Sequence, residues 1–408
     1  MLAIQTRPQR AEWLLFAAVF LIEFTLESGL FIVGPLTTEI QNSIALSDPQ
    51  VGLLTSVPTL MMGLTAILGG RLADGWGAER TIALGMTLVG IGGAMRGFTT
   101  SAGMLILWSV LLGAGIGIIF SSIPSIARQW FPHQLGLFNA MAAFALTIGV
   151  ILAQVTSTSV LSPLLGGWQG ALIFWGVAAL VAMGIWLVVA TPWAFGPAAP
   201  EQGAPTDAAW NPLKIPAVWF VAVLFAGQGL VYFLLAAWVP TLYEEAGFSA
   251  GAGTLRVSLL GLGCLIANFL MPWLSSKMNS RRAPMVLSTL LVTVSLVGYL
   301  LAATSPGIDL ILPIVAGMGV SGIFVMVMIR IAEVALRGQT GEAAALVVSF
   351  GYLLTSLGPW VAGMIRQSTG SLQQALVFLL VVSVVLIPFA LAMPRRIPST
   401  DEPAMASE

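Results

Sequence analysis

Residues 13–38 read WLLFAAVFLIEFTLESGLFIVGPLTT, and this run decides the class of fold. A helix needs about 20 mostly apolar residues to cross a bilayer, and this run is long enough. It is longer than the apolar core of a cleaved signal peptide and carries no small-residue cleavage site. We therefore interpret it as the first membrane span, interrupted near its middle by Glu23 and Glu27.

Eleven further apolar runs follow the first one. The chain has 408 residues, of which 58% are hydrophobic and 8% charged, whereas soluble domains are roughly 45–50% apolar and about 25% charged. Lipid must surround much of the chain, and lipid cannot satisfy free backbone groups, so the sequence predicts an all-α membrane protein. Its twelve transmembrane helices are expected at about 12–38, 51–71, 81–98, 103–127, 135–160, 170–191, 216–242, 254–276, 283–303, 308–331, 342–366 and 373–393.

A polar stretch after the sixth run divides the chain in two. It reads GPAAPEQGAPTDAAWNPL and is rich in proline, glycine and alanine, which predicts a linker. We expect an N-terminal six-helix bundle over 1–195, the linker over 196–213 and a C-terminal six-helix bundle over 214–394. The polar tail over 395–408 is expected to be mobile.

The two halves resemble each other at matching positions. The matching pairs are Pro35 and Pro240, Glu39 and Glu244, Arg80 and Arg282, and Arg128 and Arg330. The last two pairs share one constant offset of 202 residues. Duplicated halves with a site between them at mid-membrane are a recurring plan of transporters. We therefore expect two pseudo-symmetric bundles with a site between them.

Basic residues in short loops indicate the orientation, because such loops stay in the cytoplasm. With the N-terminus inside, the cytoplasmic segments hold Arg7, Arg10, Arg71, Arg80, Arg128, Lys214, Lys277, Arg281, Arg282, Arg330, Arg337, Arg395 and Arg396. The outer segments hold Arg96, Arg256 and Arg366. This asymmetry predicts an integral plasma membrane protein, in the bacterial inner membrane, with both termini and the linker in the cytoplasm.

Composition and motifs also exclude several classes of protein. A net charge of −1 gives no reason to expect nucleic acid, and one cysteine excludes an internal disulfide framework. One histidine argues against a histidine-based metal site. The chain lacks the phosphate-cradling loop of ATP-driven transporters. We expect no cofactor and no enzyme activity, with a small-molecule substrate, membrane lipid and protons as partners of a monomer.

The loop at residues 70–80 reads GRLADGWGAER and resembles the signature loop of the major facilitator superfamily, G-x-L-A-D-R-x-G-R-R. The positions that fit are Gly70, Leu72, Ala73, Asp74, Gly77 and Arg80, and those that depart are Gly75, Ala78 and Glu79. The resemblance implies the major facilitator fold, in which two bundles rock to expose a central cavity to each side in turn. It also implies that Asp74 and Arg80 act as gate residues on the cytoplasmic side.

Within that superfamily the chain resembles the cyanate/nitroimidazole permease family. The stretches that carry this resemblance lie in 33–58, 79–96, 125–137, 238–253 and 351–371. The resemblance implies a single-polypeptide secondary transporter for small solutes, with uptake favoured. The family typically has an Asn-Leu-Arg-Pro-like run in the first helix, where this chain has Thr25-Leu26-Glu27-Ser28. An acid stands in place of a base that would bind an anion.

Glu23 and Glu27 are the leading site candidates. They are four residues apart and share one helix face. A charge at that depth costs at least about 2.5 kcal/mol, so it must face a cavity or a partner. Two neighbouring carboxylates disfavour double ionisation and could share one proton. The pair is therefore a proton-coupling site or a receptor for a cation, unless one acid is only a hydrogen-bonding group beside another helix.

Other polar side chains at mid-membrane extend the list. By resemblance, the first, fourth, seventh and tenth helices line the cavity, so Gln228 and Tyr232 of the seventh are the next candidates. Thr147, Asn268 and Tyr352 are further ones. The alternative for all of them is hydrogen bonding between helices.

Several charged residues are gate candidates at the cytoplasmic rim, either as gating salt bridges or as ordinary loop charges. They are Asp74, Arg80, Arg128, Arg330 and Glu333. Together these features predict a secondary active transporter of a small solute by alternating access, proton-linked through the two acids. The alternatives are a multidrug-type exporter of lipophilic cations and a membrane scaffold or sensor.

Overall fold

The computed structural model describes residues 9–131, 135–190, 214–334 and 340–393. Within these ranges all regular structure is helical, as the sequence predicts. The N-terminal half contains α1 Gln9–Leu26, α2 Ser28–Phe31, α3 Val33–Ile44, α4 Asp48–Trp76, α5 Ala78–Arg96, α6 Ala102–Trp130, α7 Leu135–Thr156, the π-helical turn η1 Ser157–Leu161, α8 Ser162–Leu165 and α9 Trp168–Ala190. The C-terminal half contains α10 Pro216–Glu245, α11 Ala250–Lys277, α12 Arg282–Ala302, α13 Ile308–Val334, α14 Thr340–Thr355, α15 Leu357–Thr369 and α16 Gln373–Leu391.

Eleven of the twelve expected spans are long and apolar enough to cross a membrane. The twelfth, expected over 81–98, is α5, whose 19 residues include Glu79, Arg80 and Arg96. These charges lower its apolar character, but α5 packs against α6 and α9 within the N-terminal bundle. The described helices therefore confirm the twelve-helix arrangement that the sequence predicts.

Helix starts repeat between the halves. Ser47 precedes α4 and donates its amide to the side chain of Gln50 at 2.9 Å. Ser249 precedes α11, and its hydroxyl accepts a bond from the first turn at 3.3 Å. Two residues earlier, Ala45 has a φ of 50° and Gly247 a φ of 89°, so both turns pass through the left-handed region. The same turn at matching positions supports the pseudo-symmetry of the halves.

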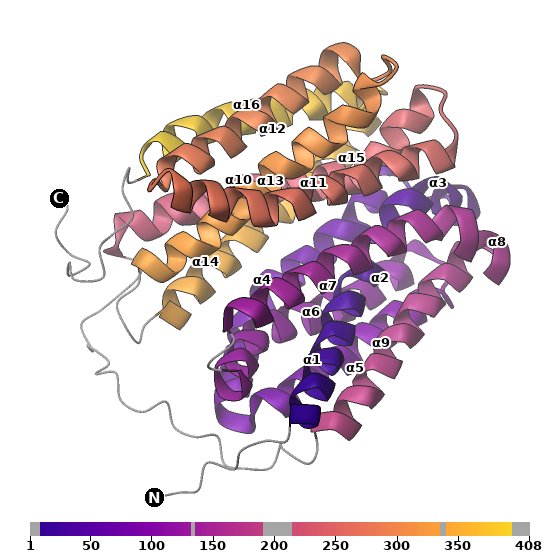
Figure 1. The fold of residues 1–408 in the computed structure, drawn as a ribbon. Helices are drawn as coiled ribbons and strands as arrows, with labels where there is room; N and C mark the ends of the chain where they lie inside the picture. Colours follow the sequence, from indigo (N-terminus) through magenta and orange to yellow (C-terminus); the bar gives the residue numbers. More distant parts are fainter. Residues whose placement is uncertain (1–8, 132–134, 191–213, 335–339, 394–408) are drawn as a thin grey trace, which may run out of the picture.

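The two halves lie side by side in Figure 1, the N-terminal half in indigo to magenta and the C-terminal half in red to yellow. Their ribbons converge at the end where α3 meets α4, and diverge toward the end near the chain termini. We call the first end the α3–α4 rim; it also carries the α10–α11 and α15–α16 connections. We call the opposite end the α4–α5 rim.

Close backbone approach joins the halves at the α3–α4 rim. The carbonyl of Ala236 on α10 lies over Gly34 of α3, and the backbone of Pro359 on α15 lies over Gly52 of α4. A methyl group at either glycine would collide with the opposing backbone. The contact between the halves at this rim therefore depends on residues without a side chain.

Three spans are interrupted helices. The first breaks at Glu27 and at Ile32, the fifth passes through η1, and the eleventh breaks at Ser356 between α14 and α15. The seventh span, α10, is one continuous helix. Interrupted helices point to binding sites in transporters, and π-helical turns are frequent at functional sites.

The predicted linker, 196–213, and the predicted tail, 395–408, lie outside the described residues. The proposed domain boundaries at these segments therefore stay predictions.

Candidate transport site

The first span bends where its hydroxyl side chains bond to its own backbone. Thr25 and Ser28 donate to the carbonyls four residues earlier, at 2.9 and 2.7 Å. Bonds of this kind bend helices. α1 ends at Leu26, and the backbone of Glu27 turns to φ −102° and ψ −5° before α2 begins. The break thus places Glu27 at the bend.

Glu23 and Glu27 are both buried, with 5% and 6% of their surface exposed. They lie one turn apart, close enough for their charges to interact. Neither carboxylate bonds to a described residue, yet neither is among the fully enclosed polar atoms of the described chain. A charged group within the membrane must face a partner or a cavity. The two carboxylates are therefore open to a proton, water or a ligand.

Arg96 fixes the backbone beside this bend. The side chain is fully buried, and its Nη1 donates to the Gly29 carbonyl at 2.8 Å. Its Nε and Nη2 are enclosed by protein and have no partner among the described residues. The sequence assigns Arg96 to an outer segment, whereas the structure shows that the protein covers it. Arg96 therefore supports the first span and presents no open face to an anion.

Glu27 lies beside the C-terminal half. Phe31, one turn further along the first span, places its ring 5.4 Å from that of Tyr232 on α10, and the Tyr352 ring on α14 lies 6.2 Å from that of Phe233. Gln228 lies one turn before Tyr232 and is 7% exposed. The structure thus places Glu27, at the bend of the first span, near Tyr232 of α10 and Tyr352 of α14, with Glu23 and Gln228 one turn away on α1 and α10.

Aromatic rings from both halves surround these polar groups. The ring of Phe31 on α2 lies 5.4 Å from that of Tyr232 and 5.2 Å from that of Phe233, between centroids. The ring of Tyr352 lies 6.2 Å from that of Phe233 and 6.2 Å from that of Phe120 on α6. We call these five residues the aromatic cluster. The sequence gives no signal for it, because phenylalanines are common in spans and these rings come from four helices.

Thr147 and Asn268 use their polar atoms within their own halves. Thr147 on α7 donates to the Ala143 carbonyl at 2.8 Å. Asn268 on α11 accepts a bond from the Ser321 hydroxyl of α13 at 2.7 Å. Bonds of this kind hold helices together in bilayers. A part for these two residues in the site stays a prediction.

The predicted gate residues lie on helices that end at the α4–α5 rim. Arg80 is exposed in the first turn of α5, and Arg330 is half-buried near the end of α13. The side chains of Asp74 on α4, Arg128 on α6 and Glu333 on α13 lie outside the described ones. The gate at this rim stays a prediction.

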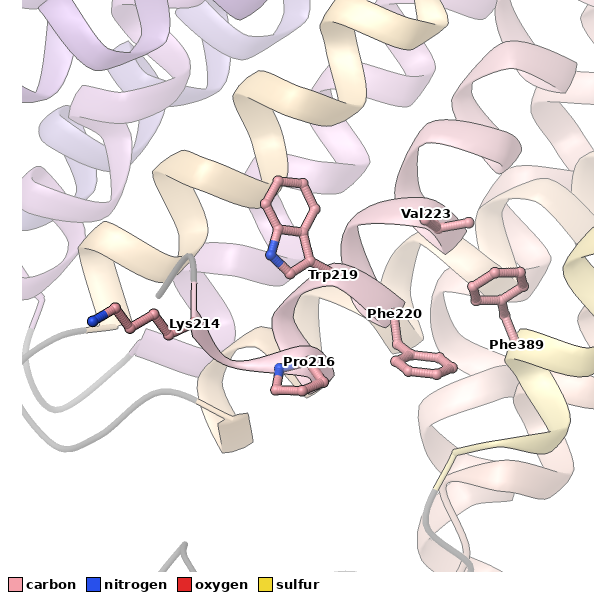
Figure 2. Close-up of a pocket in the computed structure, with 6 residues that line it drawn as sticks. All are labelled: Lys214, Pro216, Trp219, Phe220, Val223 and Phe389. Carbon is pink, nitrogen blue, oxygen red and sulfur yellow. The ribbon is translucent and has the colours of Figure 1, made fainter. Parts of the chain in front are cut away.

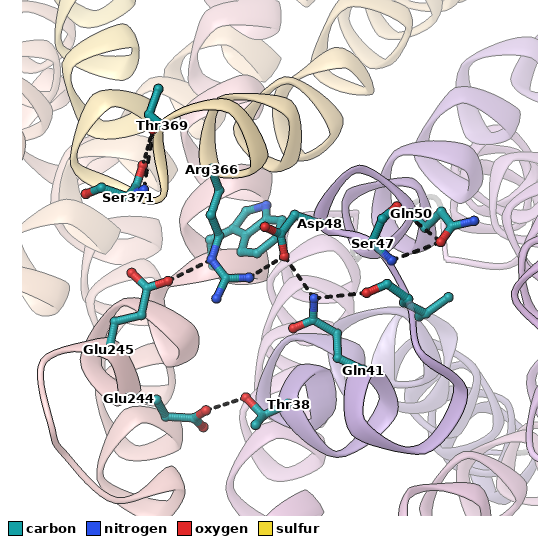
Figure 3. A network of polar contacts seen from close by, with 12 residues as sticks. Thr38, Gln41, Ser47, Asp48, Gln50, Glu244, Glu245, Arg366, Thr369 and Ser371 are labelled. Atoms are coloured by element: carbon teal, nitrogen blue, oxygen red, sulfur yellow. Dashed lines mark hydrogen bonds and ion pairs between the residues drawn. The ribbon is translucent and has the colours of Figure 1, made fainter.

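A polar network at the α3–α4 rim links the halves (Figure 3). Arg366 on α15 pairs with Asp48 of α4 and, at 2.7 Å, with Glu245 of α10. Its guanidinium also lies 5.6 Å from the centre of the Trp238 ring. Gln41 of α3 donates to Asp48 at 2.9 Å. We call Gln41, Asp48, Glu245 and Arg366 the rim network.

Further bonds cross between the halves near the rim network. Thr38 of α3 donates to Glu244 of α10. The amide of Trp360 donates to the Ser56 hydroxyl at 3.0 Å. The sequence does not reveal these contacts, because the paired residues are far apart in the chain. Arg366 and Asp48, for example, are separated by 318 positions.

A pocket of 330 Å³ lies within the C-terminal half, between the start of α10 and the end of α16 (Figure 2). Its lining residues are Lys214, Pro216, Trp219, Phe220, Val223 and Phe389. The walls are almost wholly apolar, and the pocket contains none of the proposed site residues. It does not lie between the halves, so we assign no substrate to it.

Two similar halves built from membrane-spanning helices are the arrangement of many membrane transporters. The chain belongs to the Major Facilitator Superfamily, whose sequence model matches residues 19–359 and 253–408. It is therefore an integral membrane protein that transports small molecules.

Curated bacterial relatives cover most of this chain. It is 27% identical over 390 residues to the uncharacterized transporter YycB of Bacillus subtilis, covering 92% of this chain and 91% of the relative. It is 26% identical to the cyanate transport protein CynX of Escherichia coli, covering 86% and 89%. It is also 26% identical to the 2-nitroimidazole transporter of Escherichia coli, covering 93% and 95%. The resemblance to cyanate and nitroimidazole permeases is thereby confirmed.

Solved structures share the fold at low identity. A bacterial homolog of the human lysosomal transporter Spinster, in an inward-facing and unoccupied conformation, superposes with a TM-score of 0.80 at 17% identity, covering 94% of this chain and 97% of that one. A D-xylose-proton symporter superposes with a TM-score of 0.76 at 15% identity, covering 94% and 98%. These likenesses show the fold alone.

Proposed function

We propose that this chain is a secondary active transporter that takes up a small organic solute together with protons. The observation that carries the proposal is the buried acid pair, Glu23 and Glu27, at the bend of the first span. A buried carboxylate without a partner costs at least about 2.5 kcal/mol when charged. Neutralisation by a proton or a ligand removes that cost and allows the loaded site to cross between the two sides.

The geometry supports different roles for the two acids. Glu27 lies one turn before Phe31, whose ring contacts Tyr232 across the boundary between the halves, so we assign it to the substrate. Glu23 lies one turn closer to the N-terminus, so we assign it to the coupled proton. Uptake is adopted from the resemblance to permeases.

The arrangement of the halves supports alternating access. The rim network and the close glycine contacts hold the α3–α4 rim together, while the ribbons diverge toward the other rim. With a cytoplasmic N-terminus, the closely packed α3–α4 rim is the outer one. We propose this orientation, in the bacterial inner membrane, for a monomer.

The three basic residues of the predicted outer side support this orientation. Arg96 donates to the Gly29 carbonyl, Arg256 pairs with buried Asp309, and Arg366 belongs to the rim network. None of the three is therefore a free loop charge. When these three residues are left out of the count of loop charges, the excess of basic residues on the proposed cytoplasmic side becomes larger, and the orientation rests on that excess.

Thiol labelling in intact cells tests the orientation. Pro205→Cys, introduced with Cys264→Ser to remove the native thiol, places a cysteine in the linker. We expect an impermeant maleimide to label it only after the membrane is opened. Labelling of intact cells would contradict a cytoplasmic linker.

Reconstituted protein tests proton coupling. Proteoliposomes are given an outside-acid gradient and radiolabelled cyanate, 2-nitroimidazole or benzyltrimethylammonium. We expect the gradient to drive accumulation of at least one solute by the wild type and none by Glu23→Gln/Glu27→Gln. Glu39→Gln is the matched control, because Glu39 is an acid of the same span that binds Ser162 at 2.7 Å, away from the site. Equal accumulation by the double variant and the wild type would refute the coupling.

A second candidate is proton-driven export of an aromatic cation, because acids and aromatic rings meet at this site. A cation and a proton would then compete for the same carboxylates. Binding measured in weak buffer separates the two: proton release on binding indicates export by exchange, and its absence indicates uptake with a proton.

A further inference from the structure

The buried acid and the aromatic cluster together indicate the charge of the substrate. We propose that the site selects a small aromatic cation, held by Glu27 through its positive charge and by the aromatic cluster through its ring. This inference rests on the proposed transport function and adds the chemical class of the solute. It differs from an anion such as cyanate.

The first step concerns charge. Glu27 is buried, lies one turn before Phe31, whose ring contacts Tyr232 of the opposite half, and bonds to no described residue. Arg96, the basic residue that contacts this segment, is enclosed and turned to the Gly29 carbonyl. Among the described residues, an anion at the bend would meet an acid and no accessible base. A cation would compensate the buried acid.

The second step concerns shape. The rings of Phe31, Tyr232 and Phe233 lie 5.2–5.5 Å apart, with Tyr232 and Phe233 at an interplanar angle of 84°. Such edge-to-face groups present both ring faces and ring edges to a neighbour. Ring faces attract cations, and quaternary ammonium groups are recognised by aromatic cages. Planar rings also pack well against this arrangement.

The third step concerns the two halves. Phe31 and Phe120 come from the N-terminal half, and Tyr232, Phe233 and Tyr352 from the C-terminal half. A ring bound among them would touch both halves. Substrate that bridges the halves is what an alternating-access cycle requires, because its binding then favours the state in which the halves meet around it.

Three probes of similar size separate charge from aromaticity. They are benzyltrimethylammonium, its saturated counterpart cyclohexylmethyltrimethylammonium, and benzoate, with dissociation constants measured calorimetrically on the full chain in detergent. We expect benzyltrimethylammonium to bind, the saturated cation to bind about 3- to 30-fold more weakly, and benzoate not to bind.

Two substitutions assign these preferences to residues. Glu27→Gln should weaken the binding of benzyltrimethylammonium by at least about tenfold, because it removes the charge that attracts the cation, while Glu39→Gln leaves the affinity unchanged. Tyr232→Leu should bring the two cations to similar affinity, while Phe220→Leu, at the pocket between α10 and α16, preserves the difference. Melting temperatures of the ligand-free variants identify any that fail to fold, and for those Glu27→Met and Tyr232→Ile are used instead, since they too remove the charge and the ring.

Several results would overturn the proposal. These are tighter binding of benzoate than of benzyltrimethylammonium, unchanged affinity in Glu27→Gln, or no binding of either cation to the wild type. If the wild type accumulates cyanate or 2-nitroimidazole under a proton gradient but ignores both cations, proton-linked transport stands and the aromatic-cation assignment falls. If the cations bind but no proton gradient drives the accumulation of any solute, the aromatic-cation assignment stands and proton-linked transport falls.

Discussion

The first helices of the two halves share a register but differ in chemistry. At an offset of 205 residues, the one that also pairs Pro35 with Pro240, Glu23 matches Gln228 and Glu27 matches Tyr232. The first span is broken at Glu27, whereas α10 continues through Tyr232 without a break. One half therefore contributes charge at a bend, and the other contributes an amide and a phenol on a straight helix.

A second matched pair shows the same divergence. Glu39 accepts a bond from Ser162 of its own half at 2.7 Å. Its counterpart Glu244 accepts one from Thr38 of the other half. Duplication thus supplied similar helices, and the halves then used matching acids for different purposes. In the proposed function, proton and substrate chemistry therefore resides on the first span, and α10 is its neutral counterpart.

The largest effect should come from removing the charge at the bend. Glu27→Gln should weaken binding of benzyltrimethylammonium by about 10- to 100-fold, because the Coulomb attraction between a carboxylate and a cation about 4 Å apart is about 1–4 kcal/mol between water and a protein surface. Tyr232→Phe, the matched change on the other helix, should cost no more than about tenfold, because a neutral hydroxyl contributes about 1 kcal/mol. Calorimetry measures both. Equal losses would mean that the halves are equivalent at this position.

Glu23→Gln gives the first span the same residue that α10 has at the matching position, Gln228. The variant should keep its affinity for the probe within about threefold, because only a neutral contact changes. Accumulation should however no longer respond to an imposed pH gradient, because the proton site is gone. Flux measured with and without the gradient tests this. A full response in the variant would move the proton site away from Glu23.

Much of this fold is predictable from sequence, because spans are long apolar runs and lipid forces them into helices. Glu23, Glu27, Tyr232 and Tyr352 are also detectable, since polar groups are rare and costly at mid-membrane. The aromatic cluster is not detectable, because its members have no pattern within any one helix. The rim network is hidden for a similar reason, as its charges look like ordinary loop charges until Arg366 is placed beside Asp48.

The contact between the halves can be loosened without touching the site. Gly52→Ala places a methyl group against the backbone of Pro359 and Trp360, so it should separate the halves at the α3–α4 rim. Gly251→Ala is the control, because nothing lies within 4 Å of a methyl group there. With Ser56→Cys and Cys264→Ser as background, we expect faster maleimide labelling in the Gly52 variant only. Equal rates in both variants would argue against a closed rim.

The smallest effect is expected from the rim network. Arg366→Gln should raise labelling at Ser56→Cys by only a few-fold, since partly exposed ion pairs contribute about 0–1 kcal/mol each. Arg282→Gln is the control, because Arg282 donates to the Met393 carbonyl within its own half at 2.7 Å. No difference between the two variants would show that glycine packing alone holds this rim.

The central claim is that the acids of the first span couple solute movement to protons. Proteoliposomes loaded with a pH-sensitive dye, with the membrane potential clamped, receive external benzyltrimethylammonium, and the internal pH is followed. We predict that the wild type acidifies the interior as the solute enters, that Glu23→Gln admits the solute without acidification, and that Glu27→Gln does neither. Solute entry into wild-type vesicles with no change in internal pH, or equal acidification by Glu23→Gln, would contradict the claim.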